Sequence, residues 1–430
     1  MTTQQTRKHM ARLSLPGPES IVREVLANGI TILARADFSS PSVTLSGYLG
    51  AGSILDPESK LGLADFTASA LMRGTRRHGF DDLFNKLESV GASLGFDSGI
   101  NTTSFHARCL AEDLPLLAQL LSEILREPMF PQVEIEKLRH QLLTSLAIRA
   151  QDTADMADLV FDGMLYRGHP YSRPEDGHPS TIKAIKRGDL VDFHQRTFGP
   201  QGMVIAVAGG VSPKRAVASL ARTLGTWRNP AQVRSEVPGD PKRVQTTRSR
   251  HHKIAGKAQA DLLIGTNGPR RTDKRWLAAS LGNSVLGQFG MMGRVGRAVR
   301  EQSGLAYYAY SNLAAGLGPG AWTVSAGVNP ANLDRAAGLI VRELRRFVDR
   351  GVTPEELADC KANFVGRLPL SLESNAGVAS ALLNVERFQL GMDYYQRYAE
   401  RIEAITRTEV TEIARAFIDP DRLVVATAGP

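Results

Sequence analysis

The chain has 430 residues and carries 52 Lys and Arg against 44 Asp and Glu, which gives a formal net charge of +8. This length exceeds one ordinary hydrophobic core and predicts two domains of roughly 200 residues each, and the composition excludes a disordered chain. The longest nearly apolar run, 203–211, is far shorter than the roughly 20 residues of a membrane-spanning helix, so no membrane partner is expected. Only two cysteines are present, which excludes a disulfide framework and a Cys-based metal cluster. We expect a cytoplasmic protein.

The N-terminal residues 1–18 contain Arg7, Lys8 and Arg12 but no apolar segment. They therefore predict a flexible tail and not a secretory signal.

Downstream of the tail, the hydrophobic pattern predicts strands and helices in turn. Residues 29–33 and 43–48 alternate as paired strands do. Further elements are helices at 61–73, 80–90, 114–125 and 133–150 and strands at 104–108 and 203–211. Strands and helices grouped in this way indicate an α+β class, in which helices cover a largely antiparallel sheet.

The two halves of the chain repeat each other at a displacement of 220 residues, the distance from Ile182 to Ile402. The polar helices predicted at 189–197 and 409–417 each end near a proline, and Val-Ile-Ala-Val-Ala-Gly at 204–209 aligns with Val-Val-Ala-Thr-Ala-Gly at 424–429. A gapless match of this kind indicates a duplication. We predict two homologous domains, residues 19–229 and 248–430, joined by a Pro-, Gly- and charge-rich linker at 230–247.

Basic residues are densest at 242–253, in the sequence KRVQTTRSRHHK. This segment has neither apolar periodicity nor interleaved aromatics, so a solvated linker explains it better than a nucleic-acid site. We expect no nucleic-acid partner.

The segment 51–75, with Gly62-Leu-Ala-Asp-Phe-Thr-Ala-Ser69 at its centre, resembles the insulinase, pitrilysin and mitochondrial processing peptidase family. Members of that family carry H-x-x-E-H here, with two His as zinc ligands and the Glu as general base. The resemblance places Asp65 and Ser69 at the two His positions, Ala68 at the Glu position, and Ser145 at or beside the distal ligand. Catalytic zinc needs three His, Cys or carboxylate ligands, so we expect no cofactor in this chain.

The segment 283–307 resembles the second signature of that family, an Arg near a helix end followed seven residues later by a Tyr. Arg300 and Tyr307 match this spacing, and Gly304 between them is suited to end the helix. The resemblance implies that Arg300 binds substrate carbonyls and that Tyr307 stabilises an oxyanion, facing the zinc helix inside a clamshell of two domains. Taken alone, the two residues would also suit a helix-end cation and a core aromatic. The resemblance further implies that substrate lies along an edge strand formed by Leu94, Gly95, Phe96, Asp97 and Ser98.

Two other patterns in the sequence have a structural explanation and are not assigned to a functional site. Ser93 lies in a G-x-S-x-G match, but a helix precedes it and a strand follows, the reverse of a nucleophile elbow. His169 and His178 lie among Pro and Gly as turn residues, and the adjacent His251 and His252 are assigned to the linker.

One half of the family's site is absent and the other is present, which predicts a divided enzyme. The chain would be the non-zinc subunit of a heterodimeric zinc peptidase, inactive alone. It would contribute Arg300 and Tyr307 at the zinc site of a homologous H-x-x-E-H-containing partner that acts on an oligopeptide. The alternatives are a pseudo-peptidase scaffold, like the respiratory-complex core subunits that resemble this family, and a lone esterase using Ser93.

Overall fold

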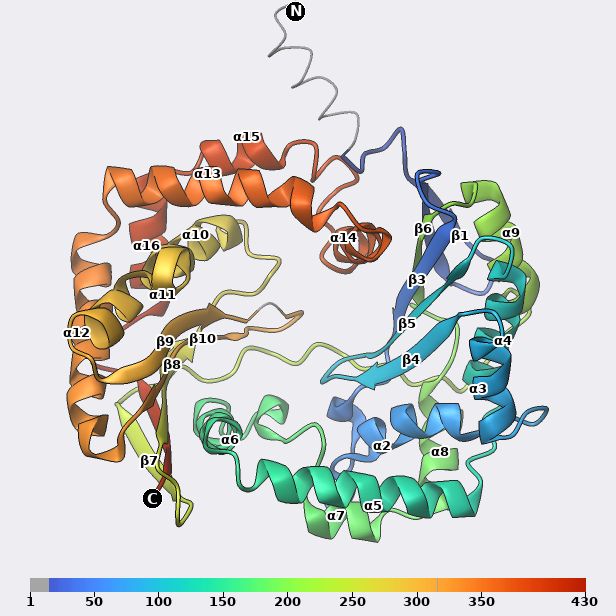
Figure 1. The fold of residues 1–430 in the computed structure, drawn as a ribbon, viewed down its shortest axis with the longest axis horizontal. Coiled ribbons are helices and arrows are strands. Elements are labelled where there is room, and N and C mark those ends of the chain that lie inside the picture. The colour runs from blue at the N-terminus through green and yellow to red at the C-terminus, as the bar shows by residue number, and fades with distance from the viewer. Residues whose placement is uncertain (1–14, 315) are drawn as a thin grey trace, which may run out of the picture. The chain divides into compact units, whose positions relative to one another are not determined.

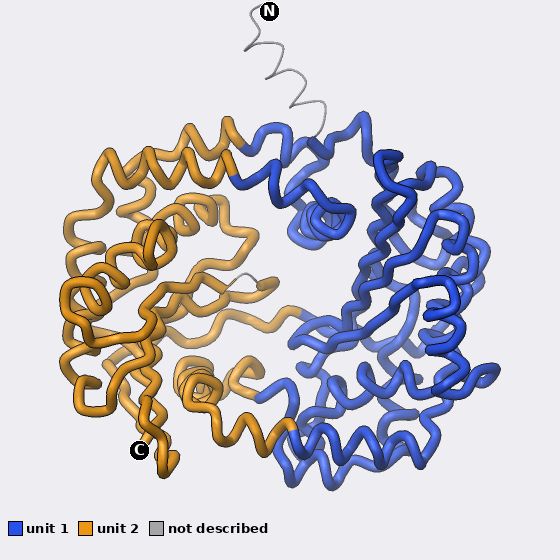
Figure 2. Tube along the Cα trace, viewed as in Figure 1, with its two compact units in different colours: residues 1–144, 174–236, 367–398 blue, residues 145–173, 237–366, 399–430 orange. Residues whose placement is uncertain are grey.

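The computed structural model describes residues 15–314 and 316–430, so most of the predicted tail at 1–18 lies outside the described residues. Two compact units make up the fold, coloured separately in Figure 2. Unit 1 contains residues up to 144 together with 174–236 and 367–398, and unit 2 contains 145–173, 237–366 and 399–430. Each unit is built around one sheet covered by helices, which confirms the predicted α+β class.

Unit 1 holds a six-stranded sheet in the order β1-β2-β6-β3-β5-β4 (Figure 1). The strands are β1 (Val22–Val25), β2 (Thr31–Ala36), β3 (Ser42–Leu49), β4 (Ser93–Ser98), β5 (Thr103–Leu110) and β6 (Val204–Gly209). The expected pairing of the strands at 29–33 and 43–48 is wrong, because β6 lies between β2 and β3 and bonds to both. All six residues of β6 are buried, and a buried strand needs a neighbour on each side to satisfy its peptide groups.

Helices cover both faces of the unit 1 sheet. The helices of unit 1 are α2 (Leu63–Ala70), α3 (Phe80–Glu88), α4 (Leu114–Arg126), α7 (Pro179–Ala184), α8 (Arg187–Thr197), α9 (Pro213–Leu224) and α14 (Asn375–Arg387), of which α7 and α8 lie outside α2 and not on the sheet. In Figure 1, α4 and α9 lie on one face of the sheet and α14 on the other.

The helix α14 comes from the second half of the sequence but packs on the first sheet. Val378, Ala379 and Leu382 form a buried cluster with Leu33 and Ala206. Conversely, α6 (Thr153–Leu165), from the first half, packs on the sheet of unit 2. The compact units therefore do not follow the contiguous ranges 19–229 and 248–430, because each half contributes one helix to the other sheet. The long helices α5 (Gln132–Arg149) and α13 (Pro354–Ser371) cross the unit boundaries.

Unit 2 holds a five-stranded sheet in the order β7-β11-β8-β10-β9. The strands are β7 (Arg248–Lys253), β8 (Ala260–Asn267), β9 (Ala306–Leu313), β10 (Ala321–Val328) and β11 (Val424–Gly429). The helices are α10 (Trp276–Gly287), α11 (Phe289–Gly296), α12 (Leu333–Arg350), α15 (Tyr398–Glu403) and α16 (Arg407–Phe417). The pairs α8 and α16, and β6 and β11, lie 220 residues apart at both ends. The predicted duplication is thus visible in the elements themselves.

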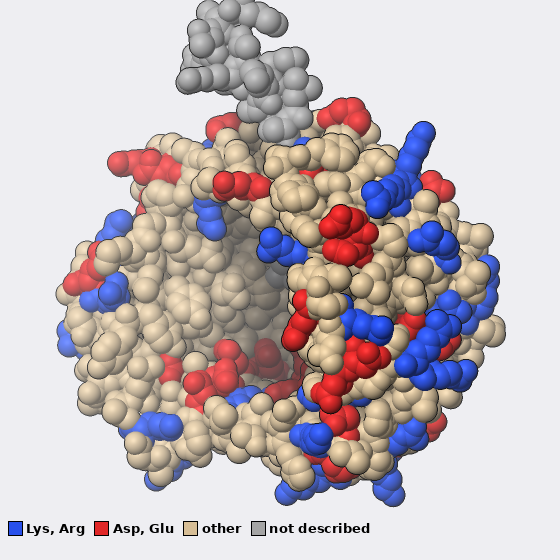
Figure 3. Space-filling model, turned by 45° about the vertical axis from the view of Figure 1, so that its right-hand side comes forward, with Lys and Arg blue, Asp and Glu red and all other residues tan. Residues whose placement is uncertain are grey.

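The assignment of the whole basic segment 242–253 to a linker is wrong at its end. Residues 248–253 form β7, which pairs in parallel with β11 at the edge of the sheet. His251 and His252 therefore belong to a strand, and His251 Nδ1 lies 2.9 Å from the hydroxyl of Thr427. Charged side chains are common on exposed edge strands, but such a strand has no apolar alternation to reveal it. On the face drawn in Figure 3, Lys and Arg are interspersed with Asp and Glu. No helix among the described residues is both long and apolar enough to cross a membrane.

Candidate functional site

The start of α2 is held in place by a buried carboxylate and by a close backbone approach. Asp56 accepts hydrogen bonds from the backbone N–H groups of Gly62 and Ala64, both at 2.9 Å. Gly62 has a φ of +91°, and a Cβ at this position would lie 2.8 Å from the carbonyl oxygen of Asp176. Only glycine allows this conformation and this approach, so the turn at Glu175 and Asp176 lies directly beside the first turn of α2.

Asp65, Ala68 and Ser69, which occupy the positions of the H-x-x-E-H motif, all lie on α2. Asp65 and Ser69 are half-buried and Ala68 is buried; Ser145, at the distal position, is exposed on α5. Ala68 has no ligand atom, and a hydroxyl is a poor zinc ligand compared with His, Cys or carboxylate. Residues 15–314 and 316–430 contain no group of three His, Cys, Asp or Glu side chains arranged for a metal. The side chains at these positions do not fit a zinc ion.

Acidic side chains surround Asp65 instead. Burial, followed by the charges of Asp176 and Asp97, raises the pKa of Asp65 to about 6. Burial and the charges of Asp176 and Asp65 likewise raise the pKa of Glu175 to about 7. The Glu175 carboxylate lies beside the turn between β4 and β5, 3.7 Å from the place of a Cβ on Gly99. We call Asp65, Asp97, Glu175 and Asp176 the acidic cluster. Its negative charge favours a cationic group beside the start of α2.

The sequence did not reveal the role of Glu175 and Asp176. They lie 110 positions or more from Asp65 in the chain (175 against 65), and no spacing rule connects a loop residue with a helix so far away. The glycine at 62 is the one local sign that another segment approaches there.

The residues of the predicted substrate strand form β4. Among the described residues this strand pairs only with β5 and is the last strand of its sheet, so one row of its peptide groups has no strand beside it there. Leu94 and Phe96 face the core, and Asp97 lies 3.3 Å from His106 on the other face. A Cβ at Gly95 would lie 2.7 Å from the exposed His106 ring, which would have to shift. An open edge of this kind can pair with an extended peptide.

In unit 2, Arg300 lies in the single π turn η5 (Arg297–Glu301). Gly304 ends this turn with a φ of +61°, and its N–H donates to the carbonyl of Arg300 at 3.0 Å. The prediction that Gly304 terminates the helix is therefore confirmed. Single π turns occur frequently at functional sites.

Tyr307 lies at a bulge in β9, the edge strand of the unit 2 sheet. Tyr308 pairs with Gly327 and Ala306 with Val328, so Tyr307 has no partner residue on β10. Tyr307 is 73% exposed. Bulges re-aim side chains and are frequent next to active sites. The exposure excludes the alternative that Tyr307 is a core aromatic.

The neighbouring Tyr308 anchors this strand. Its hydroxyl donates to the buried carboxylate of Asp261, which also accepts from the Thr153 hydroxyl and, at 3.1 Å, from the Gln259 amide. Burial and the bond to Asp261 raise the pKa of Tyr308. Tyr308 therefore stays neutral and holds β9, while Tyr307 remains free of such a bond among the described residues.

The other residues considered from the sequence, Ser93, His169 and His178, lie at the start of a strand or of a short helix. Ser93 opens β4 after helix α3, so the strand-to-helix turn of a nucleophile elbow is absent at this serine. His169 caps the short 3-10 turn η4 (Pro170–Ser172), where its Nδ1 accepts from the Tyr171 N–H at 3.2 Å. His178 lies at the N-cap of α7. Both are turn histidines, as predicted.

Two models of known protein families match this chain, one after the other along the sequence. The family model "Insulinase (Peptidase family M16)" matches residues 31–173, and "Peptidase M16 inactive domain" matches residues 184–364. The chain belongs to the insulinase family, peptidase family M16.

Insulinase-family relatives match over almost the whole chain. An uncharacterized zinc protease of Mycobacterium tuberculosis H37Rv is 27% identical over 95% of this chain and 93% of its own. An uncharacterized zinc protease of Streptomyces coelicolor is 25% identical over 93% and 87%. Subunit 1 of the mitochondrial cytochrome b-c1 complex of Rattus norvegicus is 27% identical over 63% of this chain and 56% of its own.

Solved structures share the fold of this insulinase-family chain. The peptidase M16 inactive domain from Pseudomonas fluorescens has a TM-score of 0.88 at 24% identity, covering 95% of this chain and 98% of its own. A protease from Helicobacter pylori has a TM-score of 0.89 at 17% identity, covering 97% and 100%. At these identities the likeness concerns the fold.

Proposed function

We propose that this chain is the non-zinc subunit of a two-chain zinc peptidase, in which a homologous H-x-x-E-H-containing partner holds the metal. Asp65, Ala68 and Ser69 offer a single carboxylate where three strong ligands would be needed. The relatives named zinc proteases support a peptidase role for the complex. Alone, this chain would not hydrolyse peptides.

The observation that carries the proposal is the exposure of Tyr307. A tyrosine that is 73% exposed at the bulge of an edge strand does little for the core, and a scaffold would not need it there. Peptide hydrolysis builds negative charge on the carbonyl oxygen. A phenol hydroxyl can donate a hydrogen bond to that oxygen, and removal of one such donor typically costs about 10²–10³ in kcat. Arg300 would bind a neighbouring substrate carbonyl.

The substrate that this arrangement favours is an extended oligopeptide. The open edge of β4, which includes Leu94, Gly95, Phe96, Asp97 and Ser98, would bind its backbone. The acidic cluster at the end of this strand would favour a Lys or Arg side chain near the bound segment.

Co-expression with an H-x-x-E-H-containing homologue tests the proposal. The pair should cleave peptides in a zinc-dependent manner, whereas either chain alone should not. Tyr307→Phe and Arg300→Ala should each lower kcat by about 10²-fold or more. The matched controls are Tyr310→Phe, a partly exposed tyrosine on the same strand, and Arg297→Ala, an exposed arginine on the same turn. Unchanged activity in both test variants would contradict the proposal.

The second candidate is a peptide-binding or structural pseudo-peptidase. The match to a cytochrome b-c1 subunit favours it, as do the open edges of β4 and β9, which could pair with strands of other proteins. Calorimetric titration with extended peptides, with and without the partner, separates the two. A scaffold would bind its partner or peptides with the same affinity when Arg300 and Tyr307 are replaced, and no cleavage would follow. Labelling of Ser93 by a serine-directed phosphonate would instead indicate an esterase.

A further inference from the structure

Unit 1 contains a surface pocket of about 520 Å³ where the ends of α4 and α9 lie beside α8. Its walls are Arg76, the segment 126–130 at the end of α4, one side of α8, and the segment 227–229 that follows α9. This volume is within the range of sites that hold small molecules. The pocket shares no residue with β4 or with the acidic cluster.

Positive charge predominates in the lining of this pocket, which we call the arginine pocket. Glu127 is the one acidic residue of the lining, against four arginines: Arg76, Arg126, Arg187 and Arg228. His194 also lines the pocket, but burial lowers its pKa to about 4, so it is neutral at neutral pH. The lining therefore carries three positive charges in excess, and none of the four arginines has a carboxylate partner within residues 15–314 and 316–430.

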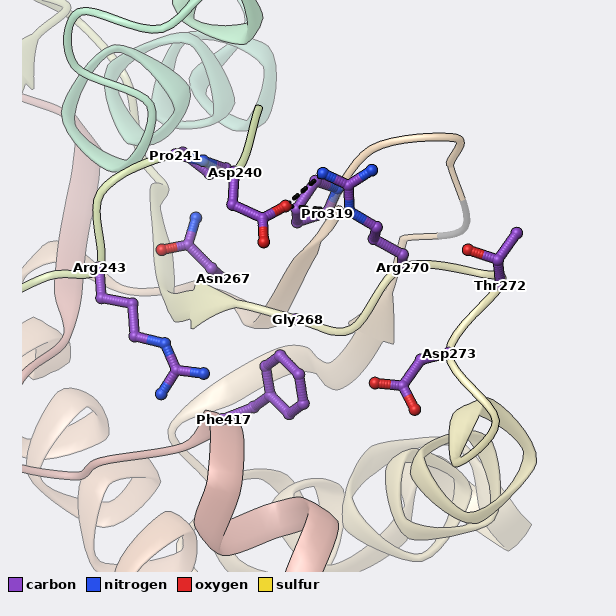
Figure 4. A pocket seen from close by; sticks show the side chains of 10 residues that line it. All are labelled: Asp240, Pro241, Arg243, Asn267, Gly268, Arg270, Thr272, Asp273, Pro319 and Phe417. Atoms are coloured by element: carbon purple, nitrogen blue, oxygen red, sulfur yellow. Dashed lines mark hydrogen bonds and ion pairs between the residues drawn. The ribbon is translucent and has the colours of Figure 1, made fainter. Parts of the chain in front are cut away.

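The smaller cavity of unit 2, which Figure 4 shows, differs in this respect. Arg270 is paired there with Asp240, and Asp273 is paired with Arg275 at 3.0 Å. Such ion pairs satisfy most of the charges of the cavity internally. Of these two sites, the arginine pocket is the one that leaves several guanidinium groups for an anion.

Main-chain carbonyls hold three of the four guanidinium groups in place. Arg126 and Arg228 donate from Nη1 to carbonyls of the segment 223–227, at 2.8 to 3.1 Å. Arg187 donates from Nε and Nη2 to the two carbonyls of the segment 129–130, both at 2.8 Å. A guanidinium has five N–H donors, so each of these groups keeps donors for a ligand. Because the groups are already fixed, a ligand would not have to order them.

The remaining donors are accessible to a ligand. Arg76 and Arg228 are exposed, and Arg126 and Arg187 are half-buried. None of their nitrogen atoms is among the enclosed polar atoms that lack a partner in the described part of the chain. The Arg76 side chain makes no hydrogen bond or ion pair with the described residues. It is therefore free to turn toward a bound anion.

The duplicated half shows that the end of α4 does not need these arginines. Gln195 of α8 corresponds to Arg415 of α16, 220 residues later, and Arg415 donates from Nε and Nη2 to carbonyls of the segment 348–349 at the end of α12. In unit 1 the carbonyl of Leu125, near the end of α4, lies 2.9 Å from Nε2 of His194 instead. This carbonyl is thus satisfied without any of the four arginines, and the shorter Gln195 lines the pocket.

We propose that the arginine pocket binds a small anion with two or three linked phosphate groups. Two phosphate groups carry about three to four negative charges at neutral pH, which matches the excess charge of the lining, whereas a carboxylate carries one. The planar fork of arginine also binds two phosphate oxygens at once. Trp227 and Phe198 are only 6% and 2% exposed, so they offer no free face to a base, and the phosphates would supply the binding energy.

This site goes beyond the proposed function. It uses neither Arg300 nor Tyr307, and all of its residues belong to unit 1, so it does not require a partner chain.

Isothermal titration of the full-length chain with pyrophosphate tests the site. Pyrophosphate should bind with a Kd below about 0.1 mM, and inorganic phosphate at least about tenfold more weakly. Arg76→Gln and Arg126→Gln should each weaken binding of pyrophosphate by at least about tenfold. The matched control is Arg196→Gln, at an exposed position on α8 that does not line the pocket, and it should bind like the unchanged chain. This control separates the site from the general attraction of a chain with a net charge of +8.

Arg76→Gln keeps the test decisive if Arg126→Gln does not fold, because the Arg76 side chain makes no bond with the described residues that its loss could break. The melting temperature of each variant shows which of them fold. Undiminished binding by Arg76→Gln would overturn the proposal, as would an equal loss in Arg196→Gln.

The choice of anion decides the remaining outcomes. Equal affinity for pyrophosphate and phosphate, or absence of binding, would overturn the proposal. Tighter binding of a tetraglutamate peptide than of pyrophosphate would also overturn it, because the pocket would then be a site for an acidic peptide. Adenosine diphosphate carries the same two linked phosphates. Tighter binding of this nucleotide would identify a nucleotide as the source of the diphosphate, and equal affinity would identify an inorganic diphosphate; both results agree with the proposal.

Discussion

Replacement of Asp65 by Asn is expected to stabilise the protein at high pH. Burial and the charges of Asp176 and Asp97 raise the pKa of Asp65 from its ordinary value of 3.8 to about 6. A carboxyl group whose pKa is higher in the folded state keeps its proton longer there, so the unfolded chain ionises first. Stability is therefore unaffected well below pH 4, falls as the pH rises from about 4 to 6, and stays lower above that range.

The size of this loss of stability follows from the shift in the pKa of Asp65. A difference of about 2 pKa units corresponds to about 3 kcal/mol, and partial solvent access to Asp65 reduces this to about 1–3 kcal/mol at pH 8. The neutral amide of Asp65→Asn avoids this cost, so the variant should gain about that much at pH 8 and only a few tenths at pH 4. Removal of the Asp65 charge should also lower the pKa of Glu175, for which Asp65 is one of the charges that raise it.

Urea unfolding at pH 4 and pH 8, followed by circular dichroism, measures the change in stability of Asp65→Asn at each pH. Asp192→Asn, at an exposed position on α8, is the matched control and should change stability by less than about 0.5 kcal/mol at either pH. An equal effect of Asp65→Asn at the two pH values would refute the reasoning. Destabilisation at pH 8 would do the same, since it would mean that the ionised carboxylate is favoured by its surroundings.

Three further predictions concern the packing. Gly62→Ala should destabilise unit 1 by about 1–3 kcal/mol in urea unfolding, because φ is +91° and a Cβ would meet the Asp176 carbonyl, whereas Gly79→Ala, with no atom within 4 Å of the new Cβ, should be close to neutral. Leu382→Ala on α14 should cost about 2–5 kcal/mol and should increase hydrogen exchange in β3 and β6; unchanged exchange there would contradict the packing of α14 on this sheet. The thiols of Cys109 and Cys360 are buried, which raises the pKa of Cys109 to about 12 and also raises that of Cys360. Neither thiol should react with a thiol reagent at pH 8 until urea unfolds the chain, and rapid labelling of the native protein would contradict this.

Local patterns predicted the elements well where one segment carries its own signal. The apolar runs at 204–209 and 424–429 became β6 and β11, and the polar helices that precede them became α8 and α16. Gly304 was predicted to end a helix and does so, because a positive φ is a property of one residue and its neighbours. In contrast, β7 was missed, because an edge strand built from charged residues lacks alternation.

The sequence by itself determined the chemistry available to this protein: the duplication, a single carboxylate among Asp65, Ala68 and Ser69, and the presence of Arg300 and Tyr307. Tertiary structure alone decided where that chemistry lies. It inserted β6 between β2 and β3, exchanged α6 and α14 between the halves, and exposed Tyr307 at a bulge. It also placed Glu175 beside Asp65. These outcomes depend on contacts between segments far apart in the chain. Such contacts are selected by packing and hydrogen bonding in the whole fold, and no local pattern encodes them.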